Sequence, residues 1–362
     1  MSEPPTQDAD EPPAGPPNAD EPPLAATTDD GESTTVAIAC QGGGSHTAYT
    51  AGFLEAVLDS WDGAAAECEL VGISGTSGGA FNAAAVWYGL VSQDASEAVS
   101  ILDGLWSDLV ADGPVDAWTN AWVVGWSRME ANGFPVFRPG PSSNPAAKVG
   151  QSQIASVLDR HIDFEAISDL CSESTPELVV GTVDVSCGTF DTFTNEEVTP
   201  EAILASTAIP KLYDAVEIDG RAYWDGLFSQ NPPIEDLFEV PPERKPDELW
   251  VIQINPQARS ETPSSAEEIA DRRNELAGNL SLNQELRFIE RVNGWIADGT
   301  LSDEEFSPVE VHRIELGREL GLSSKLDRRP SFIEELRELG RKRAAEFLER
   351  RRENVKEAVA SD

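Results

Sequence analysis

The segment GISGTSGG, residues 72–79, places a serine at the centre of a G-x-S-x-G pattern. In that pattern a strand enters a sharp turn, a helix leaves it, and the serine hydroxyl projects as a nucleophile. The surroundings of Ser77 fit, because CELVGIS reads as a buried strand and an Ala-rich helical stretch follows. Ser77 is therefore predicted to be a catalytic nucleophile, with Gly75 and Gly79 as glycines of the turn. The alternative is a purely structural strand-to-helix turn.

A serine hydroxyl needs a base beside it to act near neutral pH. Asp225 is the strongest candidate, since it directly follows VEIDGRAYW, residues 216–224, which reads as a hairpin with a two-residue Asp-Gly turn. Gly226 comes next and permits an unusual backbone angle at the strand end. A partly desolvated carboxylate at this position would accept the Ser77 proton directly, so that a dyad needs no histidine.

Two histidines offer weaker alternatives. The order Ser77, Asp225, His312 matches that of an α/β-hydrolase triad, so a triad stays open. His312, however, lies within VEVHRIEL, an alternating pattern that favours a solvated strand residue. His161 lies near a predicted helix end, and its neighbours in the sequence give even less support for a catalytic role.

A second glycine-rich stretch, CQGGGSHTAYTAGFLEAV, runs from Cys40 to Val57 and joins an apolar run to a helical pattern. Its three glycines would form an anion cradle, part of an active site, or only a tight turn. Nucleotide binding is disfavoured, because no lysine follows the glycines as a P-loop requires. His46 would orient the loop through one ring nitrogen or lend it positive charge. The alternatives without a role in the site are that it caps the helix or contacts solvent.

The order of predicted elements is strand, helix, strand, helix, which indicates an α/β fold with a mainly parallel sheet covered on both faces. A third helix is expected at residues 95–110, paired strands within 177–193 and a buried strand at 249–254. Beyond these we expect helix over 264–297, a strand at 309–316 and an amphipathic helix over 331–358. Segment 111–149 contains Trp118, Trp122, Trp126, Phe134 and Phe137 among Gly and Pro, and is expected to be a partly irregular excursion.

Composition limits the classes of function. Residues 1–33 hold eight prolines and no basic residue, which predicts a disordered acidic leader. The predicted catalytic domain covers 34–255, and 256–362 is expected to be a mainly helical C-terminal extension packed on it. The formal charge of −39 disfavours nucleic acid and anionic membranes as partners. An excess of acid with only six lysines favours a protein kept soluble in concentrated salt; an ordinary acidic cytosolic protein is the alternative.

No cofactor or metal is expected, because no metal-ligand cluster is visible in the sequence. The four cysteines lack C-x-x-C spacing and are expected to be buried thiols without disulfides. No apolar run of transmembrane length and no ordinary signal peptide is present, so a cytoplasmic location is predicted. Lys211 and Arg221, near the hairpin, read as solvated charges.

Three blocks together resemble the patatin-like family of serine acyl hydrolases: QGGGSHTAYTAGFLEAV, GISGTSGGAFNAA, and ASTAIPKLYDAVEIDGRAYWDGLFSQNPPI at 205–234. The resemblance spans roughly residues 34–255. It implies a three-layer α/β/α sandwich in which Ser77 is the nucleophile and Asp225 its general base. It also implies that Gly42, Gly43 and Gly44 form the loop whose N–H groups bind the oxyanion.

The glycine loop departs from the usual family pattern G-G-G-x-R-G. His46 stands in place of the arginine, and Thr47 in place of the last glycine. This variant is more similar to patatin-like polyhydroxyalkanoate depolymerases of haloarchaea, which implies a polyester granule as substrate. The alternatives are a lipid acyl hydrolase and a non-catalytic protein that binds a granule or lipid surface. The Trp-rich segment would then be a lid or an adsorption surface, or simply core.

Overall fold

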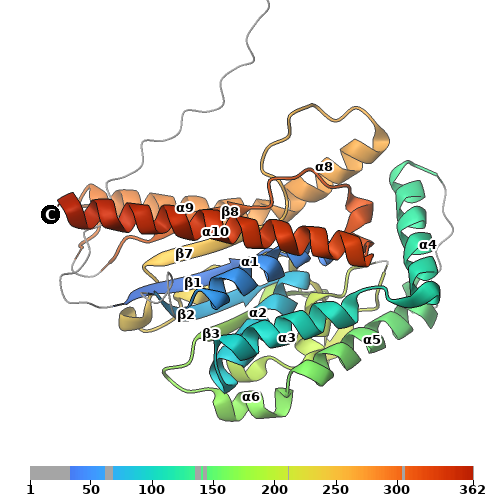
Figure 1. Cartoon of the computed structure of the whole chain (residues 1–362), viewed down its shortest axis with the longest axis horizontal. Coiled ribbons are helices and arrows are strands. Elements are labelled where there is room, and N and C mark those ends of the chain that lie inside the picture. Colours follow the sequence, from blue (N-terminus) through green and yellow to red (C-terminus); the bar gives the residue numbers. More distant parts are fainter. Residues whose placement is uncertain are drawn as a thin grey trace, which may run out of the picture.

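The computed structural model describes residues 33–61, 68–134, 140–141, 145–210, 212–303 and 306–361. The predicted leader up to residue 32, Phe137 and Lys211 lie outside these residues. What is described forms one layered arrangement around a twisted sheet (Figure 1).

The sheet has eight strands in the described residues, in the order β5-β6-β3-β2-β1-β7-β8, with β4 paired to β3. The strands from β3 to β8 in this order pair in parallel, whereas β4, β5 and β6 form antiparallel pairs at one side. The strands are β1 Thr34–Cys40, β2 Cys68–Gly75, β3 Glu177–Asp184, β4 Phe190–Thr194, β5 Val216–Ile218, β6 Arg221–Asp225, β7 Glu248–Gln253 and β8 Glu310–Glu315.

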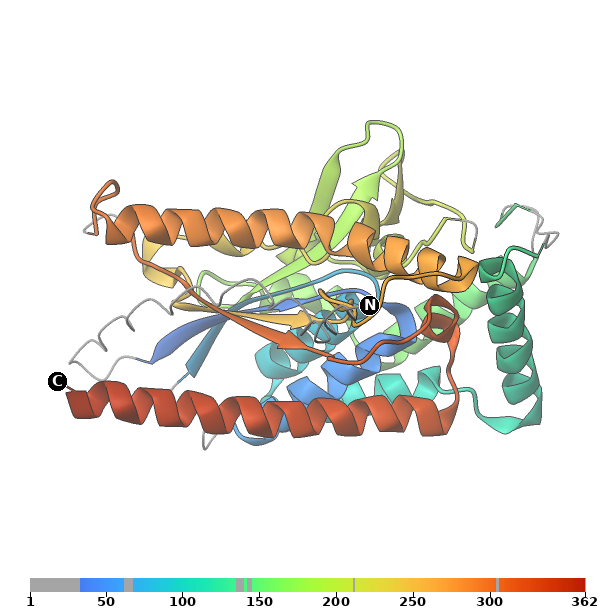
Figure 2. The same ribbon diagram turned by 90° about the horizontal axis from the view of Figure 1, so that it is seen from above.

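Helices cover both faces of the sheet (Figure 2). They are α1 Ala48–Asp59, α2 Gly78–Ser92, α3 Ala95–Leu109, α4 Gly113–Ala131, α5 Pro145–His161, α6 Phe164–Leu170, α7 Pro200–Ser206, α8 Ala266–Gly278, α9 Leu280–Ala297 and α10 Pro330–Ser361. Short 3₁₀ turns that bear on the site are η1 Gly44–Thr47, η4 Gly226–Phe228, η5 Glu235–Phe238 and η7 Leu322–Leu326. None of the described helices is both long and apolar enough to cross a membrane.

Side chains alternate between the two faces of the sheet along the central strands, and each face has its own hydrophobic core. In β1, Val36 and Ile38 point into the core shared with α1, α2, α3 and α10, whereas Ala37 and Ala39 pack in a second core with Leu282 of α9. Successive residues of a strand face opposite sides, so a strand buried on both faces must be apolar throughout. The three-layer α/β/α architecture expected from the sequence is confirmed.

The predicted hairpin is present. Asp219 and Gly220 have φ angles of 51° and 78°, the positive values that a two-residue turn requires, and β5 and β6 flank them. The pairing of β3 with β4 and the strand β7 are also confirmed. No disulfide joins the four cysteines, but only Cys40 and Cys68 are buried; the expectation of burial was wrong for the exposed Cys187.

Segment 111–149 was expected to be partly irregular, and its described part is more regular than expected. Most of its described part forms two regular helices, α4 and the start of α5. Pro114 lies in the first turn of α4, where the absent N–H costs nothing, so a proline that suggested a break instead begins a helix. Trp118, Trp122 and Phe134 are not core either, since they are 69%, 51% and 60% exposed.

The residues after 255 complete the sheet as well as pack on it. Strand β8 pairs in parallel with β7 as the edge strand, and α10 lies along α1 (Figures 1 and 2). In that contact, Arg337 of α10 donates to Glu55 of α1 over 2.7 Å. A C-terminal region that supplies a strand and a covering helix is part of the same core.

Candidate active site

Ser77 occupies a strained turn between β2 and α2. Its φ and ψ are 55° and −128°, a region that residues with a Cβ rarely adopt and that is typical of a nucleophile elbow. The motif glycines allow the chain to pack closely here. A Cβ on Gly75 would lie 2.4 Å from the carbonyl of Gly79, and a Cβ on Gly79 would lie 2.2 Å from the carbonyl oxygen of Cys40. The turn therefore requires both glycines.

Hydrogen bonds from other elements hold this turn. The backbone N–H of Ser77 donates to Ser206 Oγ over 2.9 Å, and Ser206 Oγ donates to the Gly181 carbonyl over 2.8 Å. The Thr76 hydroxyl donates to the Gln230 carbonyl over 2.7 Å. Ser206 lies at the end of α7 and was not singled out from the sequence, although it belongs to the 205–234 block.

Asp225 lies at the end of β6, fully buried, and enters the site beside Ser77. Its Oδ1 accepts a hydrogen bond from the Leu227 N–H over 2.9 Å, while Oδ2 has no hydrogen-bond partner in the described part of the chain. Burial raises the pKa of its carboxyl to about 7, against the opposing effects of the Leu227 N–H, the Ser77 hydroxyl and the Lys325 charge. The strand can end this way because Gly226 packs directly on the Gly181 carbonyl, where a Cβ would come within 2.5 Å.

The structure therefore brings Ser77 and Asp225 together, close enough for the serine hydroxyl to influence the aspartate pKa. The contact is not a well-aligned hydrogen bond, since Asp225 Oδ2 is unpaired. Catalytic hydrogen bonds are often long before substrate binds. A carboxylate that titrates near neutral pH beside a serine is suited to general-base work.

The glycine loop follows β1 and lies against the elbow. A Cβ on Gly42 would be 2.9 Å from the Cβ of Ser77, so only glycine allows this approach. The Gly42 N–H donates to Asn231 Oδ1 over 2.7 Å and is occupied. The N–H groups of Gly43 and Gly44 donate to no acceptor among the described residues. These two N–H groups are therefore free to bind an oxyanion, whereas Gly42 could do so only if Asn231 released its N–H.

A further N–H group without an acceptor in the described structure lies in the elbow itself. Gly78 is the first residue of α2, and its N–H has no acceptor in the part of the chain that the structure describes. The first N–H groups of a helix lack intrahelical partners and carry the positive end of its dipole. Gly78 was not predicted, although the N–H after the nucleophile is a common oxyanion donor.

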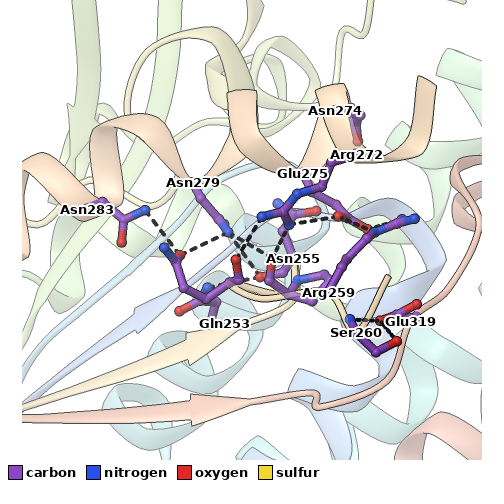
Figure 3. Close-up of polar contacts among 12 residues, drawn as sticks. Gln253, Asn255, Arg259, Ser260, Arg272, Asn274, Glu275, Asn279, Asn283 and Glu319 are labelled. Carbon is purple, nitrogen blue, oxygen red and sulfur yellow. Dashed lines mark hydrogen bonds and ion pairs between the residues drawn. The ribbon is translucent and has the colours of Figure 1, made fainter. Parts of the chain in front are cut away.

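Behind the loop lies a buried network of side-chain amides that the sequence did not indicate. Gln41 Oε1 accepts from the Asn255 N–H over 2.8 Å, and Gln41 Nε2 donates to the Asn231 carbonyl over 3.2 Å and to Asn279 Oδ1 over 2.9 Å. Asn255 and Asn279 lie side by side beneath α8 (Figure 3). Because Asn231 also accepts a hydrogen bond from the Gly42 N–H, this network holds the glycine loop in place.

His46 is buried, with 2% of its surface exposed, so the solvent contact considered from the sequence was wrong. Its Nε2 lies 2.8 Å from Ser324 Oγ, which ties η1 to η7. Burial and the nearby Lys325 charge hold the pKa of His46 well below its usual value. A neutral imidazole lends no positive charge to the loop, whereas the contact with Ser324 fits the expectation that His46 orients it.

His312 does not meet the site. It lies on edge strand β8, where its Nε2 is 3.3 Å from Glu248 and 3.4 Å from Glu310, and its ring packs edge-on against Phe347 of α10. The sequence favoured a solvated residue, whereas the side chain is only 19% exposed. Two strands, β7 and β1, separate β8 from β2, which leads to Ser77.

The other sequence candidates have structural contacts. His161 Nε2 lies 2.7 Å from Asp108 Oδ2, which joins α5 to α3. Arg221 is half-exposed and bonds to Asp184 and Asp191, so it links the hairpin to β3 and β4 rather than being merely solvated.

Among the described residues, one group gathers three ligands suited to a metal: Glu248, Glu310 and His312. Glu248 is already engaged, because Arg351 binds both of its carboxylate oxygens and the Trp250 N–H donates to one of them over 2.7 Å. Arg351 supplies the countercharge there, so this group is a structural ion cluster.

Replacing His312 with Ala is expected to leave kcat for a soluble ester unchanged, because two strands separate its strand β8 from β2, which leads to the elbow. The measurement is the steady-state rate of the folded variant. A large loss of kcat would support the Ser77–Asp225–His312 triad instead.

Comparison with known proteins gives a family match. A family model described as patatin-like phospholipase matches residues 38–238, more than half of the chain, from β1 to η5. No curated protein gives a significant match.

Solved structures show distant likeness only. VipD from Legionella pneumophila is 13% identical with a TM-score of 0.44, and the match covers 88% of this chain and 67% of VipD. The ExoU–SpcU complex from the type III secretion system of Pseudomonas aeruginosa is 13% identical with a TM-score of 0.37. That match covers 88% of this chain but only 52% of the solved chain, so this protein spans about half of its length.

Proposed function

This chain belongs to the patatin-like phospholipase family, and from that premise we propose that it is a carboxylic ester hydrolase that works through a Ser77–Asp225 dyad. The observation that carries the proposal is the buried Asp225 carboxyl, with an unpaired Oδ2 and a pKa of about 7, beside a serine on a strained turn. Burial of an acceptor without a partner is costly, and carboxyls with strongly shifted pKa values cluster at functional sites.

In the proposed acylation step, Ser77 Oγ attacks the ester carbonyl carbon and Asp225 takes the serine proton. The carbonyl electron pair moves to oxygen and forms a tetrahedral oxyanion. When this intermediate collapses, the C–O bond to the alcohol breaks and Asp225 returns the proton to the leaving oxygen. An acyl ester on Ser77 and a free alcohol result. The reverse use of the same groups lets water attack the acyl-enzyme, releasing the acid and restoring Ser77.

The oxyanion would be held by the unoccupied N–H groups of Gly43, Gly44 and Gly78. Gly44 begins η1 and Gly78 begins α2, and the first N–H groups of such elements have no partner within the helix. Loss of one such donor costs about 3–4 kcal/mol of transition-state stabilisation in related enzymes. The donors are backbone groups and therefore need no reorganisation during the reaction.

We propose a polyhydroxyalkanoate or lipid ester as substrate, in the cytoplasm and at the surface of a granule. The polyester is supported by His46 in place of the usual arginine, since a buried neutral residue offers no charge to a phospholipid headgroup. The acid-rich, lysine-poor composition supports a halophilic setting for the same subfamily. A phospholipase is the second candidate, favoured by the description of the matching family.

The two candidates separate in a parallel assay. Purified protein in molar salt would be offered amorphous polyhydroxybutyrate granules and phosphatidylcholine vesicles, and the released acids identified. Hydroxyacid release from the granules is the result expected. Release of fatty acid alone would favour the phospholipase, and binding to granules without any release would favour a non-catalytic surface protein.

The proposed domain organisation keeps 34–255 as the catalytic part, with α4 from segment 111–149 as its contact with insoluble substrate. Only Asn120 of α4 is buried. The rings of Trp122 and Trp126 pack against each other, with centroids 4.3 Å apart and planes inclined by 48°, on a helix with few charged residues. Aromatic rings supply large apolar contact area at low entropic cost. Figure 1 shows α4 standing at one end of the molecule beside α8.

Replacing Trp118 and Trp122 together with Ser is expected to weaken hydrolysis of granules or vesicles about tenfold, since the two rings contribute apolar contact. The rate on a soluble short-chain ester should not change. The matched control is Trp295→Ser, an exposed tryptophan at the far end of α9. Equal losses on soluble and insoluble substrate would contradict an adsorption role for α4.

A further inference from the structure

Lys325 is a cation held beside the active site by neutral groups. Part of the residue reaches the surface, but its ammonium group is enclosed, and Nζ donates to Asn255 Oδ1 over 2.9 Å and Asn274 Oδ1 over 2.8 Å. In the described part of the chain, no carboxylate oxygen lies within ion-pair distance of this nitrogen. An ammonium without a direct counterion acts on more distant charges.

The backbone of the same residue touches the glycine loop. Gly44 has a φ of 56°, and a Cβ at this position would lie 2.4 Å from the Lys325 carbonyl oxygen. One residue earlier, Ser324 Oγ contacts His46 Nε2 over 2.8 Å. Turn η7 therefore packs directly on η1, which begins in the loop with the oxyanion donors.

The side chain reaches the loop by a second route. Asn255 accepts from Lys325 and its N–H donates to Gln41 Oε1, while Gln41 Nε2 donates to the Asn231 carbonyl. Asn231 Oδ1 in turn accepts from the Gly42 N–H, next to Ser77. A continuous set of hydrogen bonds thus runs from the ammonium to the loop.

The charges of three carboxylates act on Lys325, those of Glu275, Asp225 and Asp271, and of these only Asp225 has a buried oxygen without a partner in the described residues. Glu275 of α8 is bound by Arg259 over 2.9 Å and by Arg272 over 3.1 Å (Figure 3). Asp271, also on α8, accepts from the Leu322 N–H over 2.7 Å. Beside Lys325 lies the neutral His46, whose pKa is also affected by the charges of Arg318 and Asp327.

Burial lowers the pKa of Lys325 to about 8, and its charge opposes the burial that raises the pKa of Asp225. Lys325 therefore stays cationic at pH 7, where Asp225 must be ionised to accept a proton. A positive charge close to a carboxylate favours its charged form.

On the premise of the proposed Ser77–Asp225 dyad, we propose that Lys325 is a positioning residue that acts through Asp225. Turn η7 holds Lys325 against the glycine loop, and its ammonium charge keeps Asp225 in the anionic form that accepts the serine proton.

The test of the charge is a direct titration of Asp225 that does not depend on turnover. Protein labelled with [γ-¹³C]aspartate would be titrated by NMR at fixed salt, with Asp225→Asn identifying the resonance. Lys325→Gln keeps an amide that can donate to Asn255 and Asn274 but removes the charge, and is expected to shift the Asp225 titration upward by about one pH unit. Lys342→Gln, at an exposed lysine of α10, is the matched control and should cause no shift.

The kinetic counterpart is the pH dependence of kcat/KM. In Lys325→Gln the acid limb should move to higher pH by the same amount, and kcat/KM at pH 7 should fall about fivefold, because the ionised fraction of Asp225 falls from about one half to about one tenth. A merely structural role would lower kcat or the melting temperature with the acid limb in place. If Lys325→Gln does not fold, Lys325→Met removes the same charge from an apolar side chain of similar length.

The outcomes separate the two proposals. An unshifted Asp225 titration in a folded Lys325 variant would overturn the role of Lys325, whether or not the protein is active. Absence of Ser77-dependent hydrolysis by the wild type would instead overturn the proposed function, and the NMR result would still decide whether Lys325 controls Asp225.

Discussion

Replacing Ser77 with Ala is expected to abolish ester hydrolysis, lowering kcat by about 10⁴–10⁶-fold, the range seen when a nucleophile is removed from a serine hydrolase. The attacking oxygen is lost, while Asp225 and the N–H groups of the loop remain. Because the Ser77 backbone already adopts a strained angle, Ala should keep the turn, and the melting temperature should change little.

The measurement is kcat on a soluble ester together with thermal unfolding. Ser156→Ala, at an exposed serine of α5, is the matched control and should be fully active. Substantial turnover by folded Ser77→Ala protein would remove Ser77 from the mechanism.

Asp225→Asn has the second largest expected effect, a fall in kcat of roughly 10²–10⁴-fold, as for loss of a general base. The wild-type rate should rise with pH through about 7, because only the ionised Asp225 carboxyl accepts a proton and its pKa is raised to about 7. The variant should lose this acid limb. Asp169→Asn, at an exposed aspartate of α6, is the control.

The same change should stabilise the protein at high pH. The pKa of Asp225 is raised in the folded state, so the folded state binds its proton more tightly than the unfolded chain, and stability falls as pH rises from the unfolded value of 3.8 to about 7. Each pH unit of that difference corresponds to about 1.4 kcal/mol. Asn carries no charge, so the free energy of unfolding of Asp225→Asn relative to wild type should increase between pH 4 and pH 8. A constant difference across that range would contradict a buried, ionised Asp225.

The fold was predictable where local pattern decides structure. The alternation of β1, the turn at Asp219 and Gly220, and the strand-turn-helix around Ser77 each depend on residues within one short segment. The helices of segment 111–149 were not expected, because Gly113 and Pro114 suggest a loop. A proline in the first turn is nevertheless compatible with a helix. The exposure of its tryptophans could not be predicted, because an apolar residue fits a buried core as well as an exposed binding surface.

The surroundings of the candidate site were not predictable. Gln41 and Asn255 are separated by 214 positions, and Lys325 meets Gly44 only because β8 returns the chain to the sheet. Polar residues just after strand ends, such as Gln41 and Asn255, are the available signal, since the carboxyl ends of parallel strands lie at one edge of a sheet. For His46, burial rather than residue type decides the charge.

The central claim is that Ser77 is a nucleophile activated by Asp225. Its most direct test is covalent labelling of the protein by a fluorophosphonate, followed by mass spectrometry, over a range of pH. The account predicts one adduct, located on Ser77, whose rate of formation rises with pH to half its maximum near 7 and is strongly reduced in Asp225→Asn. An adduct on another residue, no adduct at all, or an unchanged rate in Asp225→Asn would contradict it.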